Sequence, residues 1–368
     1  MRNYLLKISD QILSEKKAGI EIDKIEQKSH QQVQEYREII VFKNLFFVLC
    51  LFLFSLSFAQ NIEQTKVSKS ILLPKKTLAL ENIIYKTEIN GKSIALDLYR
   101  PHNSLSEKLP VVVYIHGGGW VEGDKAIQAN SYIENAILKL VEKKYAVISI
   151  DYRLVSETVH FPKPIEDCKD VIRWVRKNAV KYHFDINNIG LFGTSAGAHL
   201  ALLSAYTNDN DFVGSLELAR YSAKVNYVVD QFGPTDINKL LLTRIGEFPI
   251  GIMDVFSKQT VNLREKLING ISGFNINKDK RKIVSYFKTI SPINYIDNAV
   301  PTLIQQGNSD KIVPFKQSKK LHRKLNKLKI QNYFTIVENG VHGFKTTDQN
   351  RLDEIVEELV NFIVSQKK

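Results

Sequence analysis

The chain has 368 residues, of which 44% are hydrophobic, and it carries a formal net charge of +12 at pH 7. This length and composition suit one domain with a single large core. Lysine supplies most of the positive charge, with clusters at residues 278–282 and along 316–329. No aromatic-interleaved basic motif and no nucleic-acid-binding module accompanies them. The sequence therefore argues against a nucleic-acid partner, while attraction to an acidic polysaccharide stays open on charge alone.

Residues 45–59 are nearly all apolar and follow Lys43. This run has the length of a signal-peptide hydrophobic region and is too short to span a bilayer comfortably. Ser57-Phe58-Ala59 fits the small-x-small cleavage rule and would leave Gln60 as the new N-terminus. We therefore expect an exported protein, periplasmic or extracellular, without a stable membrane span after cleavage. A signal anchor with a cytoplasmic tail is the alternative.

Residues 1–44 form an N-terminal extension ahead of this leader. The segment is polar and charge-balanced, whereas a signal peptide begins close to its basic region. The only other methionine is Met253, so no internal methionine offers a start. Our hypothesis is that translation begins near Val41 from a non-ATG codon.

A linker is expected over residues 60–78, followed by one domain over 79–368. Residues 81–99 predict two antiparallel strands joined near Asn90-Gly91, a strong hairpin signal. Strand and helix patterns then alternate. This order predicts an α/β fold with a mostly parallel central sheet and helices on both faces.

The alternation breaks between Ile237 and Thr289, where the pattern is helical but rich in glycine. Since this stretch lies between two predicted strands, we expect a small cap insertion over residues 237–289. Its larger apolar residues could line an acyl pocket or could form the core of the cap; they are Phe248, Ile252, Met253, Phe256 and Phe274.

A serine lies at a sharp predicted turn between strand and helix. The apolar run 189–192 leads into Gly193-Thr194-Ser195-Ala196-Gly197, and a small-residue helical stretch follows. This G-x-S-x-G pattern is the nucleophile elbow, in which glycines let strand and helix approach closely. Upstream, the predicted strand 111–115 runs into His116-Gly117-Gly118-Gly119-Trp120. Backbone N–H groups of such a loop, together with that of Ala196, can point at a developing oxyanion.

An acid and a histidine follow in the chain order that this elbow requires. Asp310 comes after the predicted strand 301–306, and His342 comes after the predicted strand 332–337. Parallel α/β sheets place their sites at the carboxyl ends of the strands. Ser195 would be the nucleophile, His342 the general base and acid, and Asp310 the group that orients the imidazole. This chemistry needs no metal ion and no cofactor.

Other residues compete for these roles. We expect His199, four residues after Ser195, to pack or hydrogen-bond behind the site, and His116 to brace the glycine loop. Asp236 is the rival acid, and the cap of a helix is its more ordinary role. We expect Asp151 and Arg153 to form a structural ion pair near the site.

These motifs resemble the α/β-hydrolase esterases, among them the hormone-sensitive-lipase-like carboxylesterases. Within that neighbourhood the chain is most similar to the bifunctional feruloyl and acetyl xylan esterase family, BD-FAE. The matching stretches span roughly residues 80–365; they are 116–120, 123–125, 151–154, 161–162, 166–168, 185–201, 232–236, 291–292, 307–314 and 342–344.

The resemblance implies Ser195, Asp310 and His342 as the catalytic triad, and Gly118, Gly119 and Ala196 as the oxyanion donors. It also implies an ester substrate, acetyl or feruloyl groups on xylan-type polysaccharide. A small-molecule carboxylesterase, an arylformamidase or a peptidase of the same fold are alternatives, as is a catalytically inactive binding module. Two positions depart from the family pattern. Ala198 stands where a further glycine is common, and Gln306 stands where histidine is usual, which leaves the support of Asp310 open.

Overall fold

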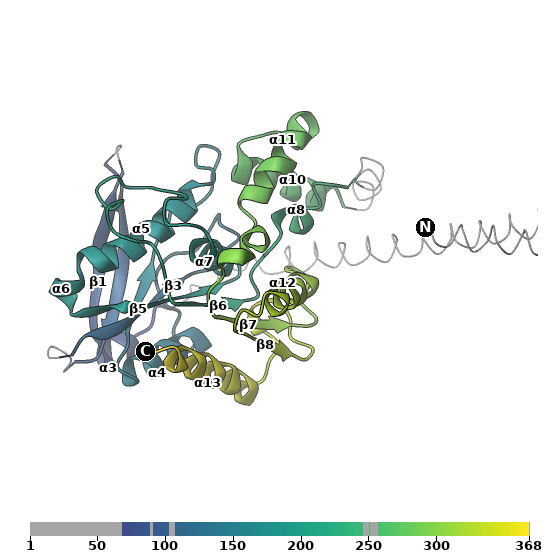
Figure 1. Ribbon diagram of the computed structural model, residues 1–368. Helices are drawn as coiled ribbons and strands as arrows, with labels where there is room; N and C mark the ends of the chain where they lie inside the picture. The colour runs from purple at the N-terminus through teal and green to yellow at the C-terminus, as the bar shows by residue number, and fades with distance from the viewer. Residues whose placement is uncertain (1–67, 89–90, 103–106, 246–249, 251–256, 368) are drawn as a thin grey trace, which may run out of the picture.

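A computed structural model describes residues 68–88, 91–102, 107–245, 250 and 257–367 (Figure 1). The expected leader at 45–59 and the extension before it lie outside the described residues. So do Phe248, Ile252, Met253 and Phe256 of the expected cap. No helix in the described part of the chain combines the length and the apolar character that crossing a bilayer requires.

The centre of the domain is one eight-stranded sheet with the strand order β1-β2-β4-β3-β5-β6-β7-β8. β1 (Leu78–Thr87) pairs antiparallel with β2 (Ser93–Arg100), and β2 pairs antiparallel with β4. From β4 to β8 the neighbouring strands are parallel. These strands are β3 (Leu109–Ile115), β4 (Ala146–Ile150), β5 (Phe184–Thr194), β6 (Tyr227–Gln231), β7 (Thr302–Gly307) and β8 (Asn332–Val337). The expected mostly parallel sheet is confirmed.

Two helical layers cover the two faces of this sheet, as the alternation of side chains along β3 shows. Val111, Val113 and Ile115 join the core cluster that includes α5 and α7, whereas Val112 and Tyr114 join the cluster that includes α4 and α13. Every residue of β3 is buried, as expected for a parallel strand covered on both sides. The bounds of these helices are α4 (Tyr132–Glu142), α5 (Lys163–Lys177), α7 (Ala196–Tyr206) and α13 (Gln349–Ser365).

The remaining helices connect the strands or extend from the sheet's edge (Figure 1). They are α3 (Leu72–Lys76), α6 (Ala179–Tyr182), α8 (Ile237–Leu240), α10 (Lys258–Ser272), α11 (Ile276–Thr289) and α12 (Lys316–Lys327). In the described part of the chain, three 3₁₀ turns accompany them; they are η1 (Pro292–Asn294), η2 (Ile296–Asn298) and η3 (His342–Phe344).

The expected linker differs from the structure at its C-terminal end. Leu73 of α3 is fully buried, and the N–H of Ser70 donates to the carbonyl of Ile127 at 2.7 Å. The N–H of Ala129 donates back to the carbonyl of Ser68 at 2.9 Å. From Ser68 onward the chain is therefore packed against the body. Leu73 belongs to a short apolar run, residues 71–73, which did not by itself predict this contact.

The insertion between β6 and β7 contains the helices α8, α10 and α11 among its described residues. Its α10 packs against the loop before α5, since the N–H of Phe161 donates to Ile271 O at 3.0 Å. His160 Nδ1 also lies 2.7 Å from Gly270 O. Phe274 is 37% exposed and lies beside Lys282, so its ring does not line an enclosed pocket.

The expected ion pair between Asp151 and Arg153 is wrong. Asp151 instead accepts from the backbone N–H of Lys125 at 2.8 Å. Arg153 donates to the fully buried carboxylate of Asp167 on α5, with Nε–Oδ2 at 2.8 Å and Nη2–Oδ1 at 2.7 Å. Lys86 Nζ on β1 lies 2.7 Å from Asp167 as well. Arg153 therefore pairs with the buried carboxylate of Asp167 and not with Asp151, its near neighbour in sequence. This carboxylate joins β1, the loop after β4 and α5.

Asp167→Ala should lower the free energy of unfolding by about 3 kcal/mol, because it removes a fully buried partner of both Arg153 and Lys86, of which Arg153 keeps Glu166 and Lys86 keeps Asp170. Urea unfolding of the variant and the wild type would measure this loss. Glu107→Ala is the control, since Glu107 and Lys144 form an exposed pair with side-chain exposures of 60% and 63%. Such pairs contribute about 1 kcal/mol or less. Equal losses in the two variants would contradict the importance of the buried network.

Candidate active site

Ser195 stands alone between the end of β5 and the start of α7, in a strained backbone conformation. Its φ is 52° and its ψ is −119°, a region that residues with side chains rarely adopt. Its N–H donates to Gln231 O on β6 at 2.9 Å, and its carbonyl accepts from His199 N at 3.1 Å. The sheet and the helix thus fix both sides of this turn, as the elbow pattern predicts.

The two glycines of the elbow are required by close backbone approach. A Cβ added to Gly193 would lie 2.4 Å from Gly197 O, and one added to Gly197 would lie 2.1 Å from Ile115 O. Either contact is far below van der Waals distance. The first turn of α7 is therefore pressed against the ends of β3 and β5, which is the reason for glycine at both positions.

The structure brings Ser195, His342 and Asp310 together. His342 Nε2 lies 2.8 Å from Ser195 Oγ, and His342 Nδ1 lies 2.8 Å from Asp310 Oδ2. In the neutral imidazole this arrangement has Nδ1–H donating to the carboxylate and Nε2 accepting the serine hydroxyl. The three residues follow β5, β8 and β7, so the carboxyl ends of parallel strands bring them to one edge of the sheet.

Neighbouring groups hold the histidine and the aspartate in place. The ring of Phe232 meets that of His342 edge-on, with 4.9 Å between the centroids. Asp310 Oδ1 accepts the N–H groups of Ile312 at 2.8 Å and Val313 at 2.9 Å. Asp310 Oδ2 accepts from Gln306 Nε2 at 2.9 Å in addition to His342. Gln306, the departure from the family pattern, therefore contacts the carboxylate directly.

The glycine loop after β3 runs beside the serine. A Cβ on Gly117 would lie 3.3 Å from Ser195 Cβ, which places this loop against Ser195. Gly118 and Gly119 have φ of 109° and 58°. A Cβ on Gly118 would lie 2.0 Å from Glu122 O, so glycine is needed there. Among the described residues we find no acceptor for the N–H groups of Gly118, Gly119 and Ala196.

His116 braces this loop, as expected. Its Nδ1 lies 2.7 Å from Gly117 O, and burial lowers the pKa of His116. Its ring stacks on that of Tyr152 with 4.4 Å between the centroids. The hydroxyl of Tyr152 in turn donates to His116 O at 3.1 Å. Sequence reasoning missed Tyr152, because its contact crosses from the loop after β4 to the loop after β3.

The rival residues lie in structural positions. His199 is fully buried, accepts from Trp120 Nε1 at 3.2 Å through Nδ1, and lies 2.7 Å from Ile290 O through Nε2. Burial lowers the pKa of His199 to about 4, so it is neutral at pH 7. The side chain of Asp236 accepts from Lys239 N and so caps α8, the role expected for it. Neither side chain bonds to Ser195 Oγ or to the His342 ring in the described residues.

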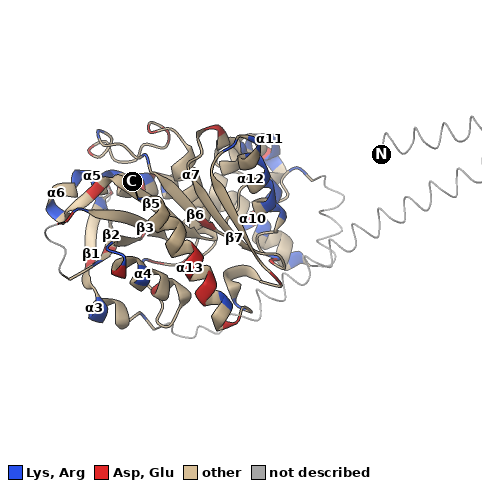
Figure 2. Cartoon of the chain, turned by 60° about the horizontal axis from the view of Figure 1, so that its bottom comes forward, with Lys and Arg blue, Asp and Glu red and all other residues tan. Residues whose placement is uncertain are grey.

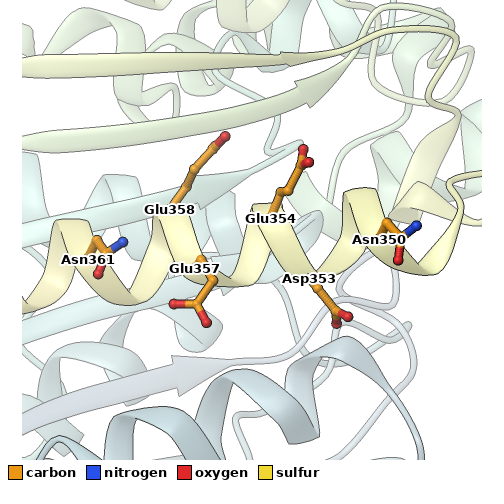
Figure 3. Close-up of a pocket in the computed structure, with 6 residues that line it drawn as sticks. All are labelled: Asn350, Asp353, Glu354, Glu357, Glu358 and Asn361. Carbon is orange, nitrogen blue, oxygen red and sulfur yellow. The ribbon is translucent and has the colours of Figure 1, made fainter.

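A surface hollow lies elsewhere, on the outer face of α13 (Figure 3). Figure 2 shows the acidic residues of this helix as a red band. The hollow is lined by Asn350, Asp353, Glu354, Glu357, Glu358 and Asn361. None of the three residues joined at the sheet edge contributes to it. No group of three or more His, Cys, Asp or Glu suited to a metal ion occurs in the described part of the chain.

Comparisons with known proteins identify the family of the chain. The model of the BD-FAE family matches residues 96–325. Esterase LipC of Mycobacterium tuberculosis is 27% identical over 259 residues, which cover 70% of this chain and 58% of that protein. An arylesterase of Saccharolobus solfataricus is 33% identical over 126 residues, which cover 34% of this chain and 39% of that protein. The chain spans about half the length of the curated relatives it matches.

Solved structures show the same α/β-hydrolase architecture. A truncated carbohydrate esterase from gut microbiota matches with a TM-score of 0.58 and 25% identity, over 82% of this chain and 99% of that chain. A propionate-bound esterase from Thermogutta terrifontis matches with a TM-score of 0.59 and 21% identity, over 77% of this chain and 93% of that chain. The second likeness concerns the fold alone. The predicted fold class is thereby confirmed.

Acid should destabilise the protein through His199, whose folded-state pKa of about 4 lies below its ordinary value of 6.5. Below pH 6.5 the unfolded chain binds this proton more readily than the folded chain. The free energy of unfolding should therefore fall by about 1.4 kcal/mol per pH unit between pH 6 and pH 4. His199→Gln removes this contribution, and urea unfolding across that range would compare the slopes. Parallel curves for variant and wild type would exclude His199 as the titrating group.

Proposed function

The chain belongs to the BD-FAE family, and from that premise we propose that it is a serine esterase that hydrolyses carboxylic esters. The observation that supports this most directly is the hydrogen-bonded series Ser195, His342 and Asp310, with 2.8 Å at each of its two links. A serine is a weak nucleophile without a base in such reach. The relatives named as esterases support the same reaction class.

In the proposed reaction, Ser195 Oγ attacks the ester carbonyl while His342 Nε2 takes the hydroxyl proton. The C–O bond to the alcohol then breaks, and His342 gives its proton to the leaving oxygen. Asp310, with both oxygens hydrogen-bonded, holds the ring orientation and stabilises the imidazolium. Water next attacks the acyl-enzyme with His342 again as base, and this step releases the acid and restores Ser195.

In this proposal, backbone donors stabilise the negative charge that develops on the carbonyl oxygen. The N–H groups of Gly118, Gly119 and Ala196 belong to the two segments that meet at Ser195. The positive φ values of both glycines turn this loop away from regular strand geometry next to the serine. Each such donor contributes about 10²–10³ in rate in related chemistry.

For the substrate we propose acetyl or feruloyl groups on a xylan-type polysaccharide. Support comes from the family resemblance, from the match to a structure described as a carbohydrate esterase, and from the expected signal peptide at 45–59. Export to the periplasm or beyond would bring the enzyme to such polymers. A small-molecule carboxylesterase is the second candidate, favoured by the arylesterase among the relatives.

We further propose that the insertion over 237–289 acts as a cap beside the acyl site. Ile271 O in α10 accepts a hydrogen bond from the backbone N–H of Phe161. The ring of Phe161 lies 6.2 Å from that of Trp120, at the end of the glycine loop. The insertion is therefore linked through two aromatic side chains to the oxyanion donors. This contact supports a role in substrate selection.

Ser195→Ala should lower kcat by about 10⁴ or more, because it removes the nucleophile. The assay follows p-nitrophenyl acetate hydrolysis and the release of acetate and ferulate from acylated xylan. Ser204→Ala is a matched control, since this serine lies on the same helix α7, is 2% exposed and has no hydrogen-bond partner for Oγ among the residues that the structure describes. It should keep activity near the wild-type value.

The two substrates separate the reaction class from the substrate proposal. Release from xylan by wild type and Ser204→Ala alone would support both parts. Hydrolysis of the small ester without release from xylan would retain the esterase and overturn the polysaccharide assignment. Equal, slow hydrolysis of both substrates by wild type and Ser195→Ala would overturn the esterase itself.

A further inference from the structure

We propose that Gln306 is a positioning residue of the catalytic site, whose side-chain amide fixes the Asp310 carboxylate toward His342 and ties that carboxylate to helix α12. The inference rests on the proposed function. Gln306 is a residue at which this chain departs from the family pattern, and its amide group contacts both Asp310 and Ser318.

The amide nitrogen of Gln306 faces the carboxylate from within the core. Gln306 is fully buried on β7, and its Nε2 lies 2.9 Å from Asp310 Oδ2 and 3.2 Å from Val313 O. Asp310 Oδ2 is also the oxygen 2.8 Å from His342 Nδ1. One carboxylate oxygen thus accepts from both the catalytic imidazole and the amide. A shift of the amide would therefore shift the direction in which this oxygen meets the ring.

The orientation of the amide is set from its other end. Ser318 on α12 is fully buried, and its Oγ donates to Gln306 Oε1 at 2.9 Å. If the amide were flipped, Oε1 would face both the Asp310 carboxylate and Val313 O, and acceptors would oppose acceptors. Only one orientation satisfies all of these groups. A continuous series of hydrogen bonds therefore runs from Ser318 through Gln306, Asp310 and His342 to Ser195.

Loss of this amide would remove one of the four donors that the described residues supply to Asp310. The N–H groups of Ile312 and Val313 hold Oδ1, so they fix one end of the carboxylate. Oδ2 would keep only His342, and the carboxylate could turn about the Oδ1 contacts. Small misplacements of a catalytic group can cost about 10²-fold in rate. The expected effect therefore falls on kcat, because Gln306 is buried behind the carboxylate and not where substrate binds.

The chain offers a matched control in the adjacent residue. Gln305 is also fully buried on β7, but its side chain points to the opposite face of the sheet. Its Nε2 donates to Ile355 O at 3.0 Å and its Oε1 accepts from Gln231 Nε2 at 2.8 Å. Gln305→Met and Gln306→Met remove the same group from equally buried positions of one strand. Only the second change touches Asp310.

The experiment compares the full-length wild type with these two variants and with Gln306→His, using p-nitrophenyl acetate. Gln306→Met should lower kcat by about 10- to 100-fold with KM changed less than about twofold. Gln305→Met should keep kcat within about threefold of wild type, although both methionine variants should lose similar stability to urea. Gln306→His, which returns an N–H donor, should recover most of the lost kcat.

Other outcomes would overturn the inference. Equal kcat for the two methionine variants would show that Gln306 only fills space. If Gln306→Met does not fold, Ser318→Ala replaces it: a lowered kcat at unchanged KM supports the proposal, and an unchanged kcat contradicts it. A separate result would overturn the proposed function: a wild-type protein that does not hydrolyse esters and whose Ser195 is not labelled by a fluorophosphonate. Since the inference rests on that function, it would fall with it.

Discussion

The strained backbone of Ser195 is the constraint on which the rest of the site depends. A positive φ at a residue with a side chain costs about 1–3 kcal/mol, and it persists only where the surroundings leave no alternative. Here the surroundings are the hydrogen bond from Ser195 N to Gln231 O and the two glycines that let α7 press against β3 and β5. The result is a hydroxyl held at the edge of the sheet, ahead of α7. Packing in the core thus offsets the backbone strain at Ser195 and fixes the position of its Oγ.

The parallel strands bring residues that are distant in the chain to Ser195 Oγ. His342 lies 147 positions after Ser195 in the chain, yet their side chains are in hydrogen-bond contact. Because successive parallel strands end at the same edge, a loop after any of them can reach the elbow. The glycine loop follows β3 and reaches Ser195 for the same reason. Each loop is then braced from behind by buried polar contacts, such as Tyr152 to the carbonyl of His116.

Local pattern was sufficient for the strands, the elbow and the order of acid and histidine, because each is written in a few adjacent residues. It was insufficient for side chains outside these motifs whose buried partners lie elsewhere in the chain. Arg153 was expected to pair with Asp151 and instead meets Asp167 on α5. Leu73 lay in an expected linker and is fully buried. Tyr152 gave no local sign of its contact, and Gln306 showed only a departure from the family pattern. Long-range pairing of buried polar groups is decided by tertiary packing, and a single sequence does not display it.

The chemistry of position 306 follows from its burial. A group beside the Asp310 carboxylate must donate a hydrogen bond to it while its own remaining atoms are satisfied in the core. Histidine can do this, but its ring titrates near physiological pH. The amide of Gln306 is neutral at every pH and uses its oxygen to accept from Ser318 on α12. The hydrogen bond from Gln306 to the carboxylate is therefore independent of protonation at physiological pH, and it is joined to a helix outside the loops of the site. The position of α12 thereby becomes part of what orients Asp310.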